Sequence, residues 1–474
     1  MSNTPVRLSI NTCFFLIPLF ASSFPAQTFL TAQTLLPAPF TDNTATVTSS
    51  TTSSTLTKQP ATLRKTLPNG LTVIAIENPV ADIIASRIFI QAGQGQETPK
   101  TAGLLDLLSA VLTKGTATKN ALEIAEVVES VGAGFGADAA SDYSIVSLKT
   151  VSADFESVLA LAAEVIQQPS FPQTEIDLER RLILQGLQSI KEQPFSVAYN
   201  HLREAIYAGH PYGLTTAQTE DCIASFTQTD LQAAHQRYYR PDNVVVTVVG
   251  RISPERSVQL IEDYFGNWQS PSTPLPAVSF PSIKRATQKI VTVQETNQAF
   301  VVIGYLADAV GGADYAALKI ISTYLGNGLS SRLFVELREK QGLAYDVSAF
   351  YPTRRSQSQF VAYIGTAPQN VPVALAGLRQ ELTRLKTTPL TAEALQVSKN
   401  KILGQYALGK QTNGQIAQTL GWYEMLGLGI EFDEAYQSAI AAVTIEDVQN
   451  AAQRCFDQES VSILGPADAV EPLR

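Results

Sequence analysis

Histidine and cysteine are scarce in this chain of 474 residues, which contains three of each. These small numbers exclude a disulfide scaffold and a cysteine-rich zinc site, and they severely restrict any metal centre built from histidine. Basic residues are too few for a phosphate-neutralising surface, because 34 Lys and Arg stand against 43 Asp and Glu, so we expect no nucleic-acid partner. With 45% hydrophobic and 16% charged residues, most of the chain is predicted to fold, in roughly two to four domains.

The first 23 residues have the pattern of an export signal. Arg7 is the only charged residue among them, and a short apolar run follows it at 13–20. This run is well below the ~20 residues that span a bilayer, and the small residues at 21–23 offer a cleavage site. We therefore expect cleavage rather than a membrane anchor, no stable membrane span, and a chain exported to the periplasm or an equivalent compartment. Cys222 and Cys455 then remain, and the sequence leaves open whether they pair.

Two segments have the composition of connectors. Residues 24–62 include a tract, 41–57, in which twelve of seventeen residues are Ser or Thr. Such a tract has too little apolar side chain to bury, so we expect a flexible tether. Four prolines interrupt residues 269–283, which predicts a linker between an N-terminal domain at 63–268 and a C-terminal domain at 284–474.

The two halves follow the same plan. Each opens with alternating β-branched runs and continues with an apolar-faced helix, at 101–113 in the first half and 313–325 in the second. A repeat of this length predicts duplicated α+β domains rather than a solenoid. We expect two α/β-sandwich domains, each an antiparallel sheet covered by helices. The run NVVVTVVG at 243–250 is expected to be a central buried strand.

Six motifs carry a resemblance to a known family. They are LPNGLTV (67–73), GLLDLLSAVLTKGT (103–116), ERRLILQGLQ (179–188), AGHPYG (208–213), YYRPDNVVVTVVG (238–250) and SSRLFVELREKQGLAYDVSAFY (330–351). In this order they resemble the pitrilysin/insulinase-type zinc peptidases, and more narrowly the processing-peptidase branch. The resemblance covers nearly all of the chain from 63 to 474. It implies a clamshell to which each chain of a heterodimer contributes one two-domain half.

Active members of that family hold zinc with an inverted motif, H-x-x-E-H, and with a carboxylate from a later helix. The two imidazoles lie on one helical face, and the Glu between them acts as the base. The flanking Gly-Leu and Lys-Gly-Thr align this chain with the motif without a gap, which places Asp106 and Ala110 at the imidazole positions and Ser109 at the base. The later carboxylate aligns with Gly186. The resemblance thus implies a chain that binds no metal and is not catalytic alone.

No other group of residues replaces the missing ligands. His201 and His210 are nine residues apart, so on a continuous helix they would face opposite ways. We expect His210, in a Gly-His-Pro-Tyr motif, to form a structural turn, and His235 to be a surface residue on a helix. Glu179, the one acidic residue kept by the later helix motif, is interpreted as a solvated helix residue or a functional one. Asp106 has no expected catalytic task without a second carboxylate.

The second half carries a different signature. The resemblance to zinc-less subunits of heterodimeric family members points to Arg338 and Tyr345 as substrate-binding residues. We expect Arg338 to lie at the end of a helix spanning 331–340, Gly342 to turn the chain, and Tyr345 to enter a strand. A phenol can donate to an oxyanion, and a guanidinium can hold a substrate carbonyl or carboxylate. The alternative is a surface ion pair for Arg338 and core packing for Tyr345.

These observations predict a non-catalytic subunit of an exported zinc endopeptidase. The resemblance implies a partner chain of the same family that carries the zinc, with peptides as substrates. A structural or assembly subunit is an alternative, as is an exported peptide-binding chaperone. An active peptidase with an unrecognised site has little support, because no metal triad or Ser/His/Asp arrangement is found.

Overall fold

The computed structural model describes residues 61–275 and 278–474. The predicted export signal and nearly all of the predicted tether lie outside the described residues. The first strand begins at Thr62, next to the expected start of folded structure. No helix in the described ranges is long and apolar enough to cross a membrane.

The first half contains a six-stranded sheet with the order β1-β2-β6-β3-β5-β4. Its strands are β1 (Thr62–Thr66), β2 (Thr72–Glu77), β3 (Ile84–Ile90), β4 (Gly134–Ala139), β5 (Ser144–Thr150) and β6 (Val244–Gly250). Strand β6 is buried along its whole length and lies between β2 and β3. This confirms the predicted central strand, and it leaves β4 at one edge of the sheet.

The second half contains a five-stranded sheet with the order β7-β11-β8-β10-β9. Its strands are β7 (Gln288–Val293), β8 (Ala299–Ala307), β9 (Asp346–Phe350), β10 (Ser358–Thr366) and β11 (Ser460–Gly465). The order repeats that of β2, β6, β3, β5 and β4, so the predicted duplication is confirmed at the level of strand order. Each sheet is antiparallel except for one parallel pair, β2 with β6 and β7 with β11.

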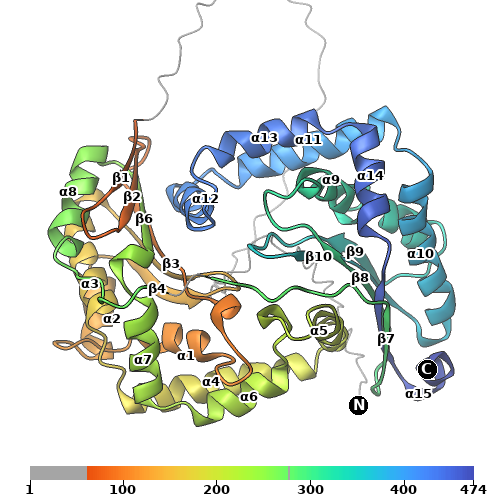
Figure 1. Ribbon diagram of the computed structural model, residues 1–474, viewed down its shortest axis with the longest axis horizontal. Coiled ribbons are helices and arrows are strands. Elements are labelled where there is room, and N and C mark those ends of the chain that lie inside the picture. Colours follow the sequence, from red (N-terminus) through yellow and green to blue (C-terminus); the bar gives the residue numbers. More distant parts are fainter. Residues whose placement is uncertain (1–60, 276–277) are drawn as a thin grey trace, which may run out of the picture. The chain divides into compact units, whose positions relative to one another are not determined.

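Helices cover the outer face of each sheet (Figure 1), and one helix of each half, α5 or α12, lies instead on an inner face. In the first half they are α1 (Leu104–Leu112), α2 (Ala121–Ser130), α3 (Phe155–Gln167), α4 (Gln173–Lys191), α5 (Pro194–Ile206), α6 (Thr216–Ser225), α7 (Gln228–Tyr238) and α8 (Pro254–Phe265). In the second half they are α9 (Tyr315–Gly326), η5 (a π-helix, Phe334–Glu339), α10 (Val371–Thr387), α11 (Ala392–Leu408), α12 (Asn413–Met425), α13 (Phe432–Ala442), α14 (Ile445–Cys455) and α15 (Ala467–Val470).

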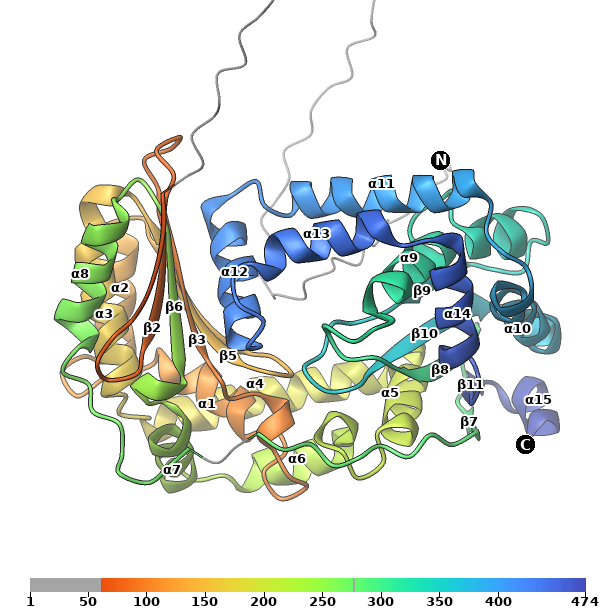
Figure 2. The ribbon, with the colours of Figure 1, turned by 45° about the horizontal axis from the view of Figure 1, so that its top comes forward.

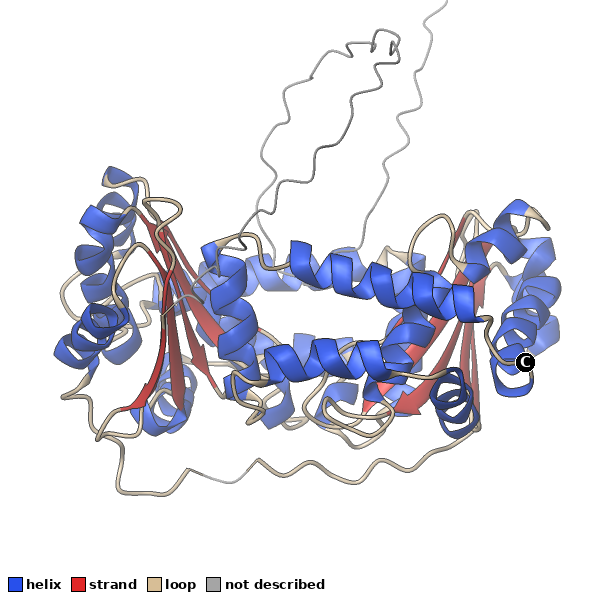
Figure 3. Ribbon diagram, turned by 90° about the horizontal axis from the view of Figure 1, so that it is seen from above, coloured by secondary structure: helices blue, strands red, loops and turns tan. Residues whose placement is uncertain are grey.

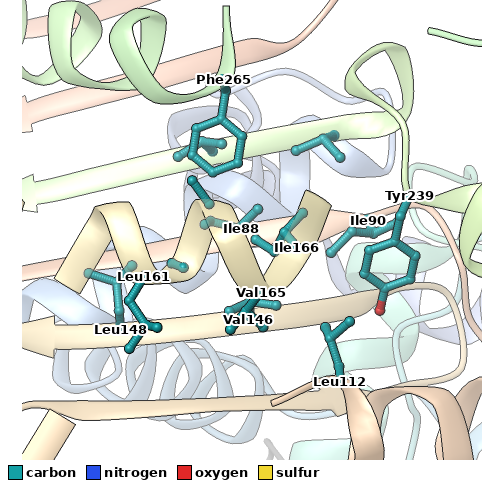
Figure 4. Close-up of a cluster of buried hydrophobic side chains, with 14 of the residues drawn as sticks. Ile88, Ile90, Leu112, Val146, Leu148, Leu161, Val165, Ile166, Tyr239 and Phe265 are labelled. Carbon is teal, nitrogen blue, oxygen red and sulfur yellow. The ribbon is translucent and has the colours of Figure 1, made fainter. Parts of the chain in front are cut away.

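The core of the first half lies between the sheet and its outer helices. Figure 4 shows part of it, where Ile88 of β3, Val146 of β5 and Val165 of α3 lie close together. Strand side chains alternate between faces, so every second residue of β3 points into this layer. The second half has an equivalent core between its sheet and α9, α10 and α14.

Each half covers the inner face of the other half's sheet with one helix, as Figure 2 shows for α12 and α5. Helix α12 packs on β3 and β6, while α5 packs on β8 and β11. The approach is close, because a Cβ at Gly421 of α12 would come within 2.3 Å of the Phe89 ring. The Thr247 hydroxyl also donates to the Ala417 carbonyl over 3.0 Å. The two sequence halves are therefore interlocked.

The predicted proline-rich linker contains no helix or strand in its described parts, 269–275 and 278–283. Figure 3 shows this loop joining the two halves. Prolines remove backbone donors and resist helix formation, so an extended connection is the expected result.

Candidate functional site

Helix α1 carries three of the four positions that aligned with the zinc site, namely both imidazole positions and the position of the base. Gly103 precedes it in a left-handed conformation, and Asp106 lies in its first turn. The Asp106 side chain is exposed, but protein surrounds it closely. Desolvation and the nearby charge of Asp138 therefore raise the pKa of Asp106 to about 6.

Ser109, at the position of the catalytic base, is committed to contacts inside the protein. Its side chain is 2% exposed, and its hydroxyl donates to Ser144 over 3.3 Å. Ser144 in turn donates to the Ala92 carbonyl over 2.6 Å. Because the hydroxyl is buried and already bonded, Ser109 offers no group to an incoming substrate or water.

The remaining positions contribute no ligand atom. Ala110 has a methyl group, and Gly186 of α4 has no side chain; a Cβ built at Gly186 would meet nothing within 4 Å. In the described ranges, no three His, Cys, Asp or Glu side chains are grouped as a metal requires. The four positions thus offer one carboxylate and one buried, already bonded hydroxyl, and two of them offer no donor atom. Such a set does not fit zinc, which takes three or four N, O or S ligands.

Glu179 is neither solvated nor free. Its carboxylate is 13% exposed and lies 2.9 Å from the Lys114 ammonium. Lys114 belongs to the Lys-Gly-Thr sequence that follows α1, so this ion pair ties α4 to the end of α1. The interpretation of Glu179 as a solvated helix residue is wrong, because α4 packs against α1 at this point.

Glu97 is a residue of this region that the sequence did not reveal. It is buried, and its two carboxylate oxygens accept hydrogen bonds from the backbone N–H groups of Gly103 and Leu105, each over 3.0 Å. Glu97 thus caps the N-terminus of α1 from outside the helix. Burial and the charge of Asp106 raise the pKa of Glu97 to about 8. No local capping pattern marks it, because the capping residue lies six positions before Gly103.

The three histidines lie in separate structural contacts. His210 is 3% exposed, accepts from the Tyr212 N–H and contacts the Ser356 hydroxyl, so the predicted structural turn is confirmed. Burial lowers the pKa of His210 to about 4. His201 contacts the Thr292 hydroxyl over 2.9 Å. His235 lies on a helix as predicted, but it is half-buried rather than fully exposed: its ring stacks on Tyr239, and its Nε2 lies 2.7 Å from the Ile166 carbonyl.

Arg338 and Tyr345 lie side by side in the second half. Arg338 is near the end of the π-helix η5, Gly342 turns the chain with a φ of +63°, and Tyr345 directly precedes β9. One Arg338 nitrogen donates to the Tyr345 carbonyl over 2.9 Å, and the guanidinium lies over the Phe334 ring. The Tyr345 side chain is 58% exposed, so the alternative in which it packs in the core is wrong.

The accessible ends of this pair face solvent rather than other protein groups. Arg338 forms no ion pair with any carboxylate in the described ranges, which removes the surface ion pair considered as its alternative role. A π-helical turn is an uncommon local geometry that often marks functional positions. The structure therefore leaves both the guanidinium and the phenol accessible.

The two remaining cysteines are free thiols. Cys455 is buried in the core of the second half, whereas Cys222 is partly exposed on α6, and its thiol donates to the Pro99 carbonyl over 3.3 Å. The sequence left their pairing open, and in this structure they are not bonded.

Fold and site together define a duplicated, peptidase-like protein whose metal positions lack ligands. Residues 72–220 match the family described as Insulinase (Peptidase family M16). Residues 225–402 match the Peptidase M16 inactive domain. The chain belongs to the insulinase family, peptidase family M16.

This chain matches two bacterial relatives over nearly their whole length. An uncharacterized zinc protease of Bacillus subtilis, YmxG, is 27% identical over 406 residues, which are 85% of this chain and 98% of the relative. An uncharacterized zinc protease of Rickettsia felis is 25% identical over 412 residues, covering 85% and 97%.

Solved structures show the same fold. A peptidase M16 inactive domain from Pseudomonas fluorescens has a TM-score of 0.80 at 24% identity, covering 85% of this chain and 98% of that one. A protease from Helicobacter pylori has a TM-score of 0.80 at 22% identity, covering 86% and 100%.

Proposed function

We propose that this chain is the non-catalytic subunit of an exported, heterodimeric zinc endopeptidase. It binds no metal itself and supplies substrate-binding residues, Arg338 and Tyr345, to a partner of the same family that carries the zinc. The substrates are peptides. The names of the relatives, zinc proteases and an inactive domain, support the peptidase part of this proposal.

The observation that carries the proposal is the contrast between the two candidate sites of one chain. The α1 positions offer a single carboxylate, that of Asp106, and the Ser109 hydroxyl is bonded internally. Arg338 and Tyr345, in contrast, are exposed and held together by a hydrogen bond of 2.9 Å. A chain that served only as a scaffold has no need to keep this pair accessible.

The chemistry of the pair suits peptide binding. One nitrogen of Arg338 is used on the backbone carbonyl of Tyr345, which ties the guanidinium to the residue that carries the phenol, directly before β9. Its other donors are free to bind a peptide carbonyl or carboxylate. The Tyr345 hydroxyl can donate to a carbonyl oxygen that gains negative charge during hydrolysis, an interaction worth roughly 3 kcal/mol in comparable sites.

A mixing experiment tests the proposal. The candidate partner is the M16 chain of the same genome that contains H-x-x-E-H. Each purified chain is assayed alone and in an equimolar mixture with quenched fluorescent peptides, and only the mixture is expected to cleave them. If the partner alone is as active as the mixture, the proposed role is wrong. A mixture whose activity is unchanged by Arg338→Ala and by Tyr345→Phe assigns the chain a scaffold role instead.

Export is a separate part of the proposal. It is supported by the charged, apolar and small-residue order of residues 1–23, and by the Ser/Thr-rich composition of the tether that follows. The test is N-terminal sequencing of the protein purified from its native cells, after cell fractionation. A mature N-terminus near residue 24 in the extracytoplasmic fraction is expected, and an intact N-terminus in the cytoplasmic fraction contradicts export.

A further inference from the structure

Arg87 is a cation without a counter-charge. It lies in the middle of β3, on the inner face that α12 covers, and its side chain is partly buried. One of its nitrogens, Nη1, donates to the Ser86 carbonyl over 3.0 Å and weakly to the Leu148 carbonyl over 3.5 Å. Its Nε and Nη2 reach no acceptor in the described part of the chain, and no carboxylate there pairs with it. Burial lowers the pKa of Arg87, with no acidic neighbour to oppose the shift.

The helix beside Arg87 makes its unpaired positive charge less favourable. A Cβ at Gly414, in the first turn of the thirteen-residue helix α12, would lie 2.9 Å from Nη2 of Arg87. The first turn of a helix carries partial positive charge on its unpaired N–H groups. A guanidinium placed against that turn is repelled by it, and a bound anion would offset the repulsion.

The surface next to Arg87 has a second cation and open space. Strand faces alternate, so Ser147 and Lys149 of β5 share the inner face with Arg87, Ser147 directly opposite and Lys149 diagonal to it. Beyond them lies the edge strand β4, whose Gly134 pairs with Lys149. A Cβ at Gly134 would touch only Lys149, at 4.0 Å.

The open space continues along β4. A Cβ at Gly136, which pairs with Ser147, would meet nothing within 4 Å. The acidic residue on this face of β4, Asp138, pairs with Ile145 and lies past Gly136, at the end away from Lys149. The shelf formed by Gly134, Gly136, Ser147, Lys149 and Arg87 is thus cationic at one end and uncrowded.

We infer that this shelf is a carboxylate-binding subsite for peptides, in which Arg87 and Lys149 hold the anionic group. The identity of the ligand as a peptide rests on the proposed function; the preference for a carboxylate rests on the two cations and the helix N-terminus. A guanidinium matches the planar geometry of a carboxylate and binds it through two hydrogen bonds. The carboxylate comes either from an Asp or Glu side chain or from the C-terminus of the peptide.

Direct binding to the isolated full chain tests the inference without a partner. Fluorescence anisotropy compares labelled, unstructured peptides that differ only by one central Glu or Gln, each with a free or an amidated C-terminus. The wild-type chain is expected to bind the acidic forms about tenfold more tightly. Preference between the Glu and Gln peptides assigns the subsite to side chains, and preference for the free acid over the amide assigns it to the C-terminus.

Substitutions test which residues cause the preference for acidic peptides. Arg87→Met is expected to abolish the roughly tenfold difference and Lys149→Met to reduce it, whereas Lys289→Met, a control at an exposed lysine on β7, keeps it. Arg87→Met is also expected to raise the Tm, because it removes an unpaired cation from the helix N-terminus. Equal binding of acidic and neutral peptides, no peptide binding, or a preference that survives Arg87→Met overturns the inference.

These outcomes are independent of the heterodimer. A mixture with the zinc-bearing chain that fails to cleave peptides contradicts the proposed function, but it leaves the binding preference of the isolated chain intact. Loss of the carboxylate preference leaves the partnership intact.

Discussion

The two halves of this molecule share a strand order but differ in what they do with their candidate sites. In the first half, the position of the catalytic base is a serine whose hydroxyl is buried against Ser144. In the second half, Arg338 and Tyr345 remain exposed and hydrogen-bonded to each other. In the first half, therefore, the candidate site is occupied by hydrogen bonds within the protein, whereas in the second half polar groups remain available to a ligand.

The largest effect on turnover is expected from removing the exposed guanidinium of Arg338. Arg338→Ala is predicted to lower the turnover of the mixture with the zinc-bearing partner by about 10²-fold, because a donor to the substrate is removed. The measurement is steady-state kinetics with a quenched fluorescent peptide. Arg251→Ala is the matched control, since Arg251 is an exposed arginine of the first half with only a loose pairing to Asp82 at 3.9 Å. Equal losses for both variants contradict a specific role for Arg338.

A pH effect is expected at the contact between the halves that involves His210. Its folded pKa, about 4, lies below the value of 6.5 for an unperturbed histidine, so the unfolded chain binds the proton more readily. Stability contributed by neutral His210 is therefore present above pH 6.5 and lost as the pH falls toward 4, by about 2–3 kcal/mol.

Denaturant unfolding at a series of pH values measures this loss. His210→Asn keeps an acceptor for the Tyr212 N–H but does not titrate, so its stability is expected to fall less between pH 6.5 and 4. Parallel curves for the two proteins contradict the assignment to His210.

Several local features of the fold could be predicted from the sequence. The run at 243–250 forms the buried central strand β6 as predicted, and Gly342 turns the chain after η5 as expected. These features depend on local patterns of polarity, capping and glycine, which a sequence displays directly.

The contacts between distant segments were not predictable in the same way. The sequences of α5 and α12 do not indicate which sheet each helix covers, and both helices cover the sheet of the other half. Glu97 and His235 were missed or misplaced for the same reason. Glu97 caps a helix across a loop, and His235 is half-buried against Tyr239 and the end of α3, so neither contact follows a short-range spacing rule.

A smaller effect, on stability, is expected at Asp106 of the first half. The folded pKa of Asp106 is raised to about 6 from an ordinary value of 3.8, so its ionised form is disfavoured in the folded chain above pH 6. Asp106→Asn is predicted to raise the free energy of unfolding by about 1 kcal/mol at pH 8 and to leave it unchanged below pH 3.8, after discounting for exposure. Denaturant unfolding at pH 8 and below 3.8 measures both values. A loss of turnover in the mixture would show that Asp106 has a task after all.

The smallest effect concerns the position of the missing carboxylate. Gly186→Ala is predicted to raise stability by about 0.5–1 kcal/mol, because the new methyl group enters open space and glycine is a poor helix former. The matched control is Gly421→Ala in α12, which is expected to destabilise the chain because its Cβ would collide with Phe89. Thermal unfolding compares the two, and a destabilising Gly186→Ala means that the position is packed rather than open.

The most direct test of the central claim is the zinc content of the isolated chain. The full-length protein, purified after exposure to zinc and extensive dialysis, is analysed by inductively coupled plasma mass spectrometry alongside its zinc-bearing partner. The account predicts one zinc per partner chain and no stoichiometric zinc in this one. One tightly held zinc per isolated molecule, together with peptide cleavage that a chelator abolishes, would contradict it.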